Sequence, residues 1–508
     1  MLLVRPSGHH WSMAGLVLTL LLLSFSLGCG DSTTPLPPSS AVQVKVGDAA
    51  ADRVIAFEMT LTSLVLTTSN GQQVTALSEP RRIEFTRLAG GLEPVALLDL
   101  PQGTYTEAAV VGADVHLTYL DAAGAIREFG NNAEFRTGMM LDPALVVSTA
   151  SVIGMDLNLG ASILSLDPTN TEPPQFQPVY HFSAAPVAGT EQGEEQGALE
   201  HVIGVVTAAD SGSFTMLLGQ NGIPLTFMVD ASTAFQGVTL TTLPNMLVEV
   251  DGVTAANGTL FAERVSGLTN SGGAVVEGML YDGMLPAAGI TSRTARWGAG
   301  ELVVQDGAGN GMVNGLVGTP VSVDFSSASY GINGEGMPDG WAFDLIGGLV
   351  FNAATMIPGQ QVQIVSDTGI TPLAGGHTLP ARTVTLQEQA ASGVVTDYRD
   401  GLSFSLVFHI AETKSVTPRS AVSMPVAAFD LQLPEDSYLH LLTPFTSVSV
   451  GVFPETRLYG ASSVSDFMNV RVRGWILYFD DQLVMIADRI DFVSAAAPIN
   501  ARTGVPHH

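Results

Sequence analysis

The sequence carries very little positive charge. It has 20 Lys and Arg residues against 48 Asp and Glu residues, and Lys45 and Lys414 are the only lysines. The formal net charge of −28 argues against nucleic-acid binding, because an acidic surface is repelled by phosphate groups. The simplest interpretation of the acidity is a well-solvated surface. The alternative is a surface that binds cations or basic partners.

Cysteine is almost absent as well. Cys29 is the only cysteine among the 508 residues. The chain therefore cannot form an internal disulfide, and a cysteine-ligated zinc site, which needs several thiolates, is excluded. We expect the fold to depend on hydrophobic burial and strand pairing alone.

The motifs of common enzyme classes are missing too. The chain has no G-x-S-x-G elbow, no H-E-x-x-H motif and no phosphate-binding G-x-x-x-x-G-K-[ST] loop. Its internal histidines are scattered, with no pair at a spacing typical of metal ligands, and we expect them to be structural or surface residues. They are His116, His181, His201, His377, His409 and His440. The sequence therefore predicts no catalytic residue, no cofactor and no metal site.

The composition that remains is typical of β-structure. Hydrophobic residues make up 46% of the chain, and 54 glycines and 28 prolines accompany them. The first 28 residues instead follow the plan of a secretory signal peptide, with Arg5 before the apolar stretch "GLVLTLLLLSF" at 15–25. That stretch is about half of the roughly 20 residues that cross a bilayer, which argues against the alternative of a spanning anchor.

The residues Ser26, Leu27, Gly28 and Cys29 resemble the lipobox of bacterial lipoproteins, although Ser26 replaces the leucine favoured there. The resemblance implies that the signal is removed and that Cys29 carries a lipid anchor, including an acyl chain such as palmitate. Residues 29–41 are rich in Pro and Ser, which predicts an extended tether. Because Gly30 rather than an acidic residue follows Cys29, we expect the outer membrane of the cell envelope, facing the periplasm or the surface.

The segment from 42 to 186 alternates in the manner of β-strands, with a hairpin signal at Asn70-Gly71. Four stretches, "VKVGDAAADRVIAFEMTLTSLVL", "LLDLPQGTYTEAAV", "MDLNLGASI" and "FQPVY", resemble an uncharacterised β-domain found at the N-terminus of many bacterial lipoproteins. The resemblance implies a β-sandwich like those of prealbumin or immunoglobulin domains. Residues 187–200, "VAGTEQGEEQGALE", predict an exposed acidic linker.

An internal repeat follows the linker. "GVVTAADSGSFTMLL" at 204–218 resembles "GVVTDYRDGLSFSLVF" at 393–408, and "LVEVDGVTAANGTLFAERVSGL" at 247–268 resembles "VRVRGWILYFDDQLVMIADRIDFV" at 470–493. The copies resemble a second uncharacterised family of small barrel-like β-modules, found repeated in exported bacterial proteins. We expect an all-β chain with a sandwich and three such modules. Their predicted boundaries are 201–268, 274–386 with an insertion, and 391–494, before a flexible tail at 495–508.

A few residues are candidates for function. Four aromatic residues could form a platform on which a sugar stacks, although aromatic residues of β-modules are more often core. They are Trp297, Tyr330, Trp341 and Trp475. The repeated Arg264 and Arg489 could clamp a ligand, but a pairing with a carboxylate at the end of a strand is the simpler expectation. "DGAGNG" at 306–311 fits a calcium loop incompletely and predicts a turn, and Asp480-Asp481 predicts an exposed hairpin tip.

Together these features predict a membrane-anchored cell-envelope lipoprotein with a non-catalytic structural, surface-binding or scaffolding role. Its expected partners are the lipid bilayer, through the N-terminal lipid, and an envelope protein or glycan, but no nucleic acid. The alternatives are a carbohydrate- or cation-binding protein and a hydrolase with dispersed carboxylates. A cluster of buried acids in one cleft would favour the hydrolase.

Overall fold

The computed structural model describes residues 39–49, 53–88, 92–167, 172–187, 197–219, 222–281, 299–310, 313–333, 350–373, 376–400, 426–460, 463–479 and 481–492. Residues Ser40–His508 form one compact unit. Nearly all regular structure in the described part is β-strand, which confirms the all-β prediction. The short helical elements are η1 (Thr86–Leu88), α2 (Leu159–Ser162), η2 (Val313–Gly315) and α4 (Tyr438–Leu442).

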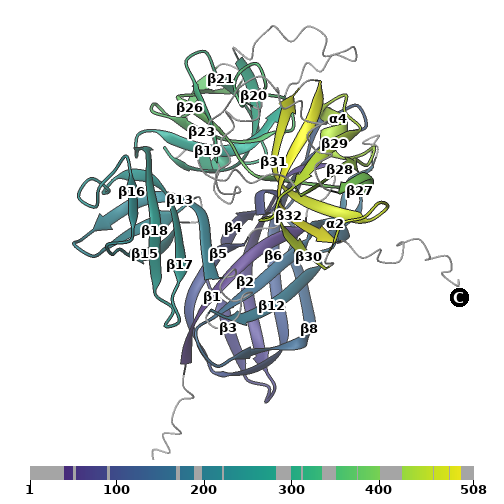
Figure 1. Cartoon of the computed structure of the whole chain (residues 1–508). Coiled ribbons are helices and arrows are strands. Elements are labelled where there is room, and N and C mark those ends of the chain that lie inside the picture. Colours follow the sequence, from purple (N-terminus) through teal and green to yellow (C-terminus); the bar gives the residue numbers. More distant parts are fainter. Residues whose placement is uncertain are drawn as a thin grey trace, which may run out of the picture. The chain divides into compact units, whose positions relative to one another are not determined.

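Two sheets form a sandwich at the start of the described chain (Figure 1). One has the order β12-β9-β1-β5, and the other has the order β3-β2-β6-β7, with β4 paired to β2 and β8 to β6. The strands are β1 (Ser39–Ala49), β2 (Val54–Thr68), β3 (Gln73–Leu77), β4 (Arg81–Glu84), β5 (Glu93–Pro101), β6 (Gly103–Leu120), β7 (Ile126–Asn131), β8 (Phe135–Val147), β9 (Ser151–Asn158) and β12 (Tyr180–Pro186). A separate two-stranded sheet pairs β10 (Ile163–Ser165) with β11 (Gln175–Phe176).

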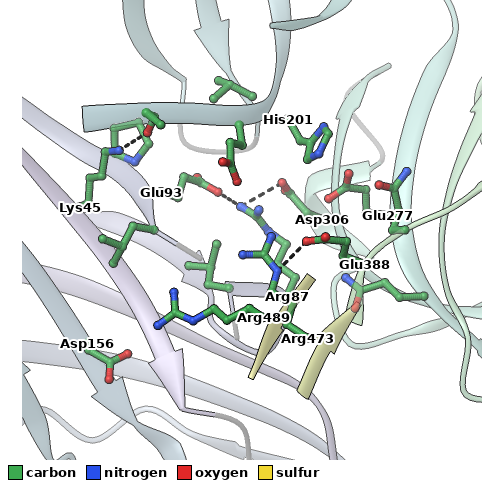
Figure 2. A pocket seen from close by; sticks show the side chains of 18 of the residues that line it. Lys45, Arg87, Glu93, Asp156, His201, Glu277, Asp306, Glu388, Arg473 and Arg489 are labelled. Carbon is green, nitrogen blue, oxygen red and sulfur yellow. Dashed lines mark hydrogen bonds and ion pairs between the residues drawn. The ribbon is translucent and has the colours of Figure 1, made fainter. Parts of the chain in front are cut away.

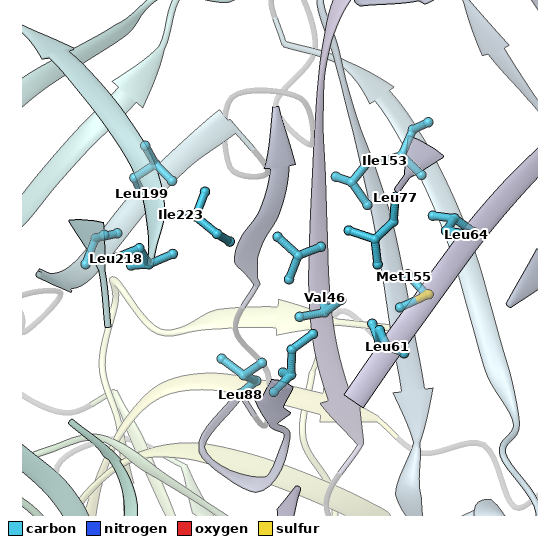
Figure 3. Packing of buried hydrophobic residues seen from close by; sticks show 14 of the residues in the cluster. Val46, Leu61, Leu64, Leu77, Leu88, Ile153, Met155, Leu199, Leu218 and Ile223 are labelled. Carbon is cyan, nitrogen blue, oxygen red and sulfur yellow. The ribbon is translucent and has the colours of Figure 1, made fainter. Parts of the chain in front are cut away.

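Alternation along β1 decides which side chains form the core of the sandwich. Val44 and Val46 are buried and join Ile153 and Met155 of β9 in one cluster with the facing sheet (Figure 3). Successive side chains of a strand point to opposite faces, so Lys45 lies on the outer face of the same sheet. A polar residue is thereby held on a rigid strand outside the sandwich core.

The next six strands form a closed barrel, called here the first barrel. They are β13 (Ala198–Ala209), β14 (Ser213–Leu218), β15 (Ile223–Met228), β16 (Ala234–Gln236), β17 (Met246–Thr254) and β18 (Leu260–Asn270). Their order is β15-β14-β13-β17-β18-β16, and a further pairing of β15 with β18 closes a ring of five strands. Closure pairs the backbone N–H and C=O groups that the edge strands of an open sheet would leave without partners.

The last six strands repeat this arrangement as the third barrel. They are β27 (Gln389–Asp400), β28 (Ala427–Gln432), β29 (Ser447–Val452), β30 (Arg457–Tyr459), β31 (Asn469–Phe479) and β32 (Gln482–Phe492). Their order is β29-β28-β27-β31-β32-β30, closed by a pairing of β29 with β32. The two barrels therefore share one strand order, strand for strand.

The strands between them form one sheet of eight strands, called here the second barrel, although no pairing among its described strands closes it into a ring as in the other two. They are β19 (Ala274–Tyr281), β20 (Ala299–Gly309), β21 (Pro320–Asp324), β22 (Ser329–Ile332), β23 (Gln361–Ser366), β24 (Thr371–Leu373), β25 (Gly376–Pro380) and β26 (Thr383–Leu386). The order is β22-β26-β23-β19-β20-β21-β25-β24. β25 pairs with β21 and β26 with β22, both in parallel, so the two strands together take the position that β18 has in the first barrel.

A glycine recurs at one position in the first strand of each barrel. A Cβ atom at Gly204 would lie 2.2 Å from the carbonyl oxygen of Leu217, and one at Gly393 would lie 2.3 Å from that of Gln432. The equivalent distance from Gly278 to the oxygen of Val303 is 2.2 Å. Since only glycine lacks Cβ, it allows the neighbouring strand to approach this closely.

Three local predictions need correction. β1 begins at Ser39, inside the predicted tether, and β13 begins at Ala198, inside the predicted linker. Asp306 to Gly309 belong to β20, where the sequence predicted a turn. In each case strand pairing with a distant segment outweighs the local preference of polar or glycine-rich residues for loops.

Candidate functional site

A cavity of about 970 Å³ opens among the sandwich and all three barrels (Figure 2). Its volume is at the upper end of the range of about 300–1,000 Å³ that is usual for small-molecule sites. The sandwich contributes Lys45 and Asp156, and the first barrel contributes Glu200 and His201. The second and third barrels also contribute lining residues.

The outer face of the sandwich sheet contributes part of the lining. Lys45 of β1 pairs with Gly154 of β9, two residues before Asp156 on the same face. The Lys45 side chain is 0% exposed, and its Nζ donates to the carbonyl of Ala198 in the first barrel. Burial lowers the pKa of Lys45 to about 7, although the charge of Glu200 raises it. Burial likewise raises the pKa of Asp156 above its usual value.

The third barrel presents a face rich in arginine. On paired strands, Arg473 of β31 lies opposite Arg489 of β32, and Arg457 of β30 lies opposite Arg489 from the other side. Two residues away on the same strands, Asp491 of β32 lies between Arg471 of β31 and Tyr459 of β30. All six residues line the cavity. Like charges directly opposite each other on neighbouring strands are unfavourable, so this arrangement needs compensation.

Carboxylates provide that compensation for most of the arginines. Arg473 Nε lies 2.7 Å from Glu388 Oε2, and Arg457 Nη2 lies 2.6 Å from Asp488 Oδ2. Arg489 Nε donates to both carboxylate oxygens of Asp491, and its guanidinium lies 4.0 Å from the centre of the Tyr459 ring. The charge of each is therefore balanced within the wall.

Arg471 differs from its neighbours. No hydrogen bond or ion pair joins it to another residue of the described chain, and its Nε is buried without an acceptor there. Asp491 lies opposite it on β32, and Asp156 lines the same cavity. The charge of Arg471 lowers the pKa of Asp156 against the stronger effect of burial. Among the described residues, Arg471 is thus the one cavity arginine whose guanidinium has no hydrogen-bond or ion-pair partner.

The wall between the sandwich and the second barrel is held by Arg87 of η1. Its Nη2 contacts Glu93 Oε2 and lies 3.1 Å from Asp306 Oδ2 on β20. Glu277 of β19 pairs with Asp306 and also lines the cavity. Burial raises the pKa of Glu277 to about 7, although the Arg87 charge opposes the rise.

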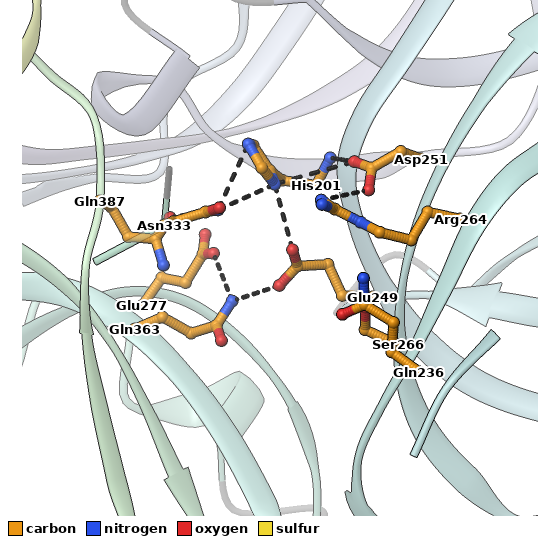
Figure 4. Close-up of polar contacts among 10 residues, drawn as sticks. All are labelled: His201, Gln236, Glu249, Asp251, Arg264, Ser266, Glu277, Asn333, Gln363 and Gln387. Atoms are coloured by element: carbon orange, nitrogen blue, oxygen red, sulfur yellow. Dashed lines mark hydrogen bonds and ion pairs between the residues drawn. The ribbon is translucent and has the colours of Figure 1, made fainter. Parts of the chain in front are cut away.

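A polar network centred on His201 connects the first and second barrels (Figure 4). His201 Nδ1 lies 3.1 Å from Glu249 Oε1, and the His201 backbone N–H donates to Asp251 Oδ1 over 2.8 Å. Gln363 Nε2 donates to Glu249 Oε2 over 2.9 Å. Burial lowers the pKa of His201, but the hydrogen bond and charge of Glu249 outweigh it and raise the pKa to about 9. His201 is therefore a cation at neutral pH.

The charge of the cavity contrasts with that of the whole chain. Six of the 20 basic residues line it, against seven of the 48 acidic ones. The basic residues are Lys45, Arg87, Arg457, Arg471, Arg473 and Arg489, and the acidic ones are Glu93, Asp156, Glu200, Glu277, Asp306, Glu388 and Asp491. In a chain with so few cations, this gathering makes the cavity the strongest candidate site in the described part.

The predicted aromatic platform is not assembled by the described residues. Trp475 is 0% exposed and belongs to the core of the second and third barrels, so no ligand can stack on it. Tyr330 is half-buried against Phe351, with the ring centres 6.1 Å apart. Trp297 and Trp341 lie outside the described residues, as does the predicted lipidation site Cys29.

The two repeated arginines have different roles. Arg264 Nη2 lies 2.6 Å from Asp251 Oδ2, the structural pairing that the sequence predicted. Arg489 lines the cavity, although it too is paired. Arg457, Arg471 and Arg473 were missed by the sequence analysis. The signal that could have found two of them is the "VRVR" alternation at 470–473, which places both arginines on one face of a strand.

No group of three or more His, Cys, Asp and Glu side chains in the described ranges is arranged to hold a metal ion. Within the same ranges, no helix has the length and apolar character that crossing a membrane requires.

Comparison with known families identifies one part of the chain. Residues 203–266 match the model of a family described as a domain of unknown function, DUF5666. The matched residues lie within the first barrel. The match agrees with the resemblance to an uncharacterised module that the sequence analysis gave for the first repeat. No curated protein matches the chain. β13 of the first barrel supplies His201 and Ile203 to the cavity lining, and Ile203 is the first residue of the match.

Proposed function

We propose that this chain is an envelope-anchored, non-catalytic binding protein whose cavity holds a small polar ligand. The observation that carries the proposal is the cavity itself, which gathers six of the chain's 20 basic residues. Five of them lie on strands of the sandwich and the third barrel, and Arg87 lies on η1. A site placed on strands is held more precisely than one placed on loops. The barrels then act as a scaffold that brings these strands together.

A cavity-filling substitution tests the binding role. Ala198 lines the cavity on β13, whereas Ala209 lies at the other end of the same strand, away from it. The protein is dialysed against the low-molecular-weight fraction of an envelope extract, and retained solutes are identified by mass spectrometry. A solute enriched by the native protein and by Ala209→Trp, but not by Ala198→Trp, supports the proposal. Equal retention by all three proteins, or none by the native protein, overturns it.

We also propose the lipid anchor at Cys29, supported by the Ser26-Leu27-Gly28-Cys29 sequence after an apolar stretch. Several acyl chains on one residue anchor stably where a single chain does not. Cells that produce the protein are labelled with a palmitate analogue, and the intact mass of the membrane-bound form is measured. Labelling that Cys29→Ser abolishes and Ser32→Ala keeps supports the anchor. A mature protein with a free thiol at Cys29 contradicts it.

A hydrolase is the second candidate, because seven carboxylates line the cavity. Glu277, whose pKa burial raises to about 7, has the character of a general acid near neutral pH. Its neighbour Asp306, however, is held by Arg87, which favours a structural or binding role. Release of nitrophenol from nitrophenyl glycosides, lost in Glu277→Gln, would support hydrolysis. Equal background rates in the native protein and Glu277→Gln would exclude Glu277 as its acid.

A further inference from the structure

We propose that the cavity binds an oxyanion, a carboxylate or phosphate carried on a hydroxylated, sugar-like body, with Arg471 as the anion-binding residue. This inference rests on the proposed binding function and names its ligand class. It follows from the hydrogen-bonding state of the lining residues.

The cavity contains buried donors that lack acceptors. Arg87 Nε, Gln387 Nε2 and Arg471 Nε are buried and have no hydrogen-bond partner in the described chain. All three residues line the cavity, and Gln387 is only 7% exposed. A buried donor without an acceptor lowers the stability of the folded protein. Because all three unpaired groups are donors, they indicate a ligand that supplies acceptor atoms.

The charges of the lining leave one cation available for that ligand. Arg87, Arg473 and Arg489 each have a carboxylate within hydrogen-bond distance. Arg471 has none, and it stands on the same strand face as Arg473. A guanidinium presents a planar fork of donors that fits the two oxygens of a carboxylate or phosphate. Arg471 therefore selects an oxyanion rather than a cation or a neutral group.

The acidic residues of the lining do not exclude an anion, because most of their charge is neutralised locally. Glu93 and Asp306 share Arg87, and Asp491 is held by Arg489. Glu277 has its pKa raised by burial, and Glu388 is paired with Arg473. The remaining lone pairs of these carboxylates can accept hydrogen bonds from hydroxyl groups. Acceptors around one uncommitted arginine fit a ligand that has both hydroxyls and an oxyanion.

Isothermal titration with three probes of similar size tests the inference: glucuronate, glucose 6-phosphate and glucose. The native protein should bind at least one of the two anions about tenfold more tightly than glucose, with an affinity that falls as salt is added. The preferred anion identifies the oxyanion source. Arg471→Met should lose this preference. Arg136→Met, at an exposed ion pair with Glu134 away from the cavity, should keep it.

The outcomes separate this inference from the proposed function. If glucose binds as tightly as both anions, the oxyanion inference is wrong while binding in the cavity stands. If Arg471→Met keeps the anion preference, Arg471 is not the anion-binding residue. If none of the probes binds at millimolar concentration, the ligand class is wrong, and the dialysis experiment with Ala198→Trp decides on the cavity separately. Circular dichroism of Arg471→Met, unchanged from the native protein, shows that a loss is not due to misfolding.

Discussion

Gln305 of the second barrel donates from Nε2 to the backbone carbonyl of Ile55 in the sandwich over 2.6 Å. The two residues are 250 positions apart, and neither is more than 1% exposed. The same amide nitrogen lies 3.1 Å from Thr86 Oγ1, directly before Arg87 of the cavity wall. This one side chain therefore ties β20 to the sandwich beside the candidate site.

Replacing Gln305 tests the importance of that tie. Gln305→Leu should lower the free energy of unfolding by about 1–3 kcal/mol, because the buried carbonyl of Ile55 loses one of its two donors and keeps only the Thr86 hydroxyl. Urea denaturation followed by circular dichroism measures the change. Gln432→Ala is the matched control, since Gln432 is exposed and donates to a carbonyl at the surface. An equal effect of the two substitutions would contradict the structural role given to Gln305.

The glycine at the start of each barrel gives a second prediction. In Gly393→Ala the new Cβ would lie 2.3 Å from the Gln432 oxygen, and the strands would have to separate. We expect a loss of about 1–3 kcal/mol in the free energy of unfolding, as for an overpacked core. Gly138→Ala on β8, where no atom lies within 4 Å, should change stability by less than about 0.5 kcal/mol. Thermal melts of both variants measure the two changes, and equal melting temperatures would contradict the role given to Gly393.

His201 should make stability depend on alkaline pH. Its pKa is raised from 6.5 to about 9 in the folded chain, so the folded state holds a proton that the unfolded state releases between these values. The stability that His201 contributes is fully present below pH 6.5 and is lost as the pH rises through about 9. Urea midpoints should therefore fall more steeply between pH 6.5 and 9 in the native protein than in His201→Gln. The exposed His181→Gln should follow the native curve, and parallel curves for all three would refute the prediction.

Glu277 gives the corresponding prediction on the acidic side. Its pKa is raised from 4.5 to about 7, so its contribution to stability is present below pH 4.5 and is lost as the pH rises through about 7. Glu277→Gln removes the buried charge, and its urea midpoint should exceed the native one at pH 8 by more than at pH 5. Glu134→Gln at the exposed pair with Arg136 is the control. If the urea midpoint of Glu277→Gln differs from the native one by the same amount at pH 5 and pH 8, ionised Glu277 does not destabilise the folded protein.

The strands and the repeat could be predicted from the sequence because their signals are local. Alternation in "VQVKV" places Val44 and Val46 on the inner face and Lys45 on the outer face, which is how β1 lies. The similarity of 204–218 to 393–408 likewise includes the pair Gly204 and Gly393, where two strands approach closely. Periodicity and repeated turns report such features directly.

The cavity could not be predicted from the sequence because its residues are brought together by long-range contacts. Nothing near Lys45 in the sequence indicates that its ammonium will meet the carbonyl of Ala198. Trp475 was considered as a surface ring, yet its place on β31 turns it into the barrel core, while Arg471 and Arg473 on the same strand face the cavity. Which face of a two-sided strand meets a neighbouring barrel is settled by tertiary packing, and one chain's residue pattern does not contain it.

The span of the cavity lining, from Lys45 to Asp491, has a consequence for the timing of assembly. Multidomain chains fold from the N-terminus during synthesis, so the sandwich and the first barrel take shape before the arginines of β30, β31 and β32 exist. The cavity is completed only when nearly the whole chain has emerged. A ligand that occupies it would stabilise finished molecules alone and leave truncated ones exposed to proteolysis.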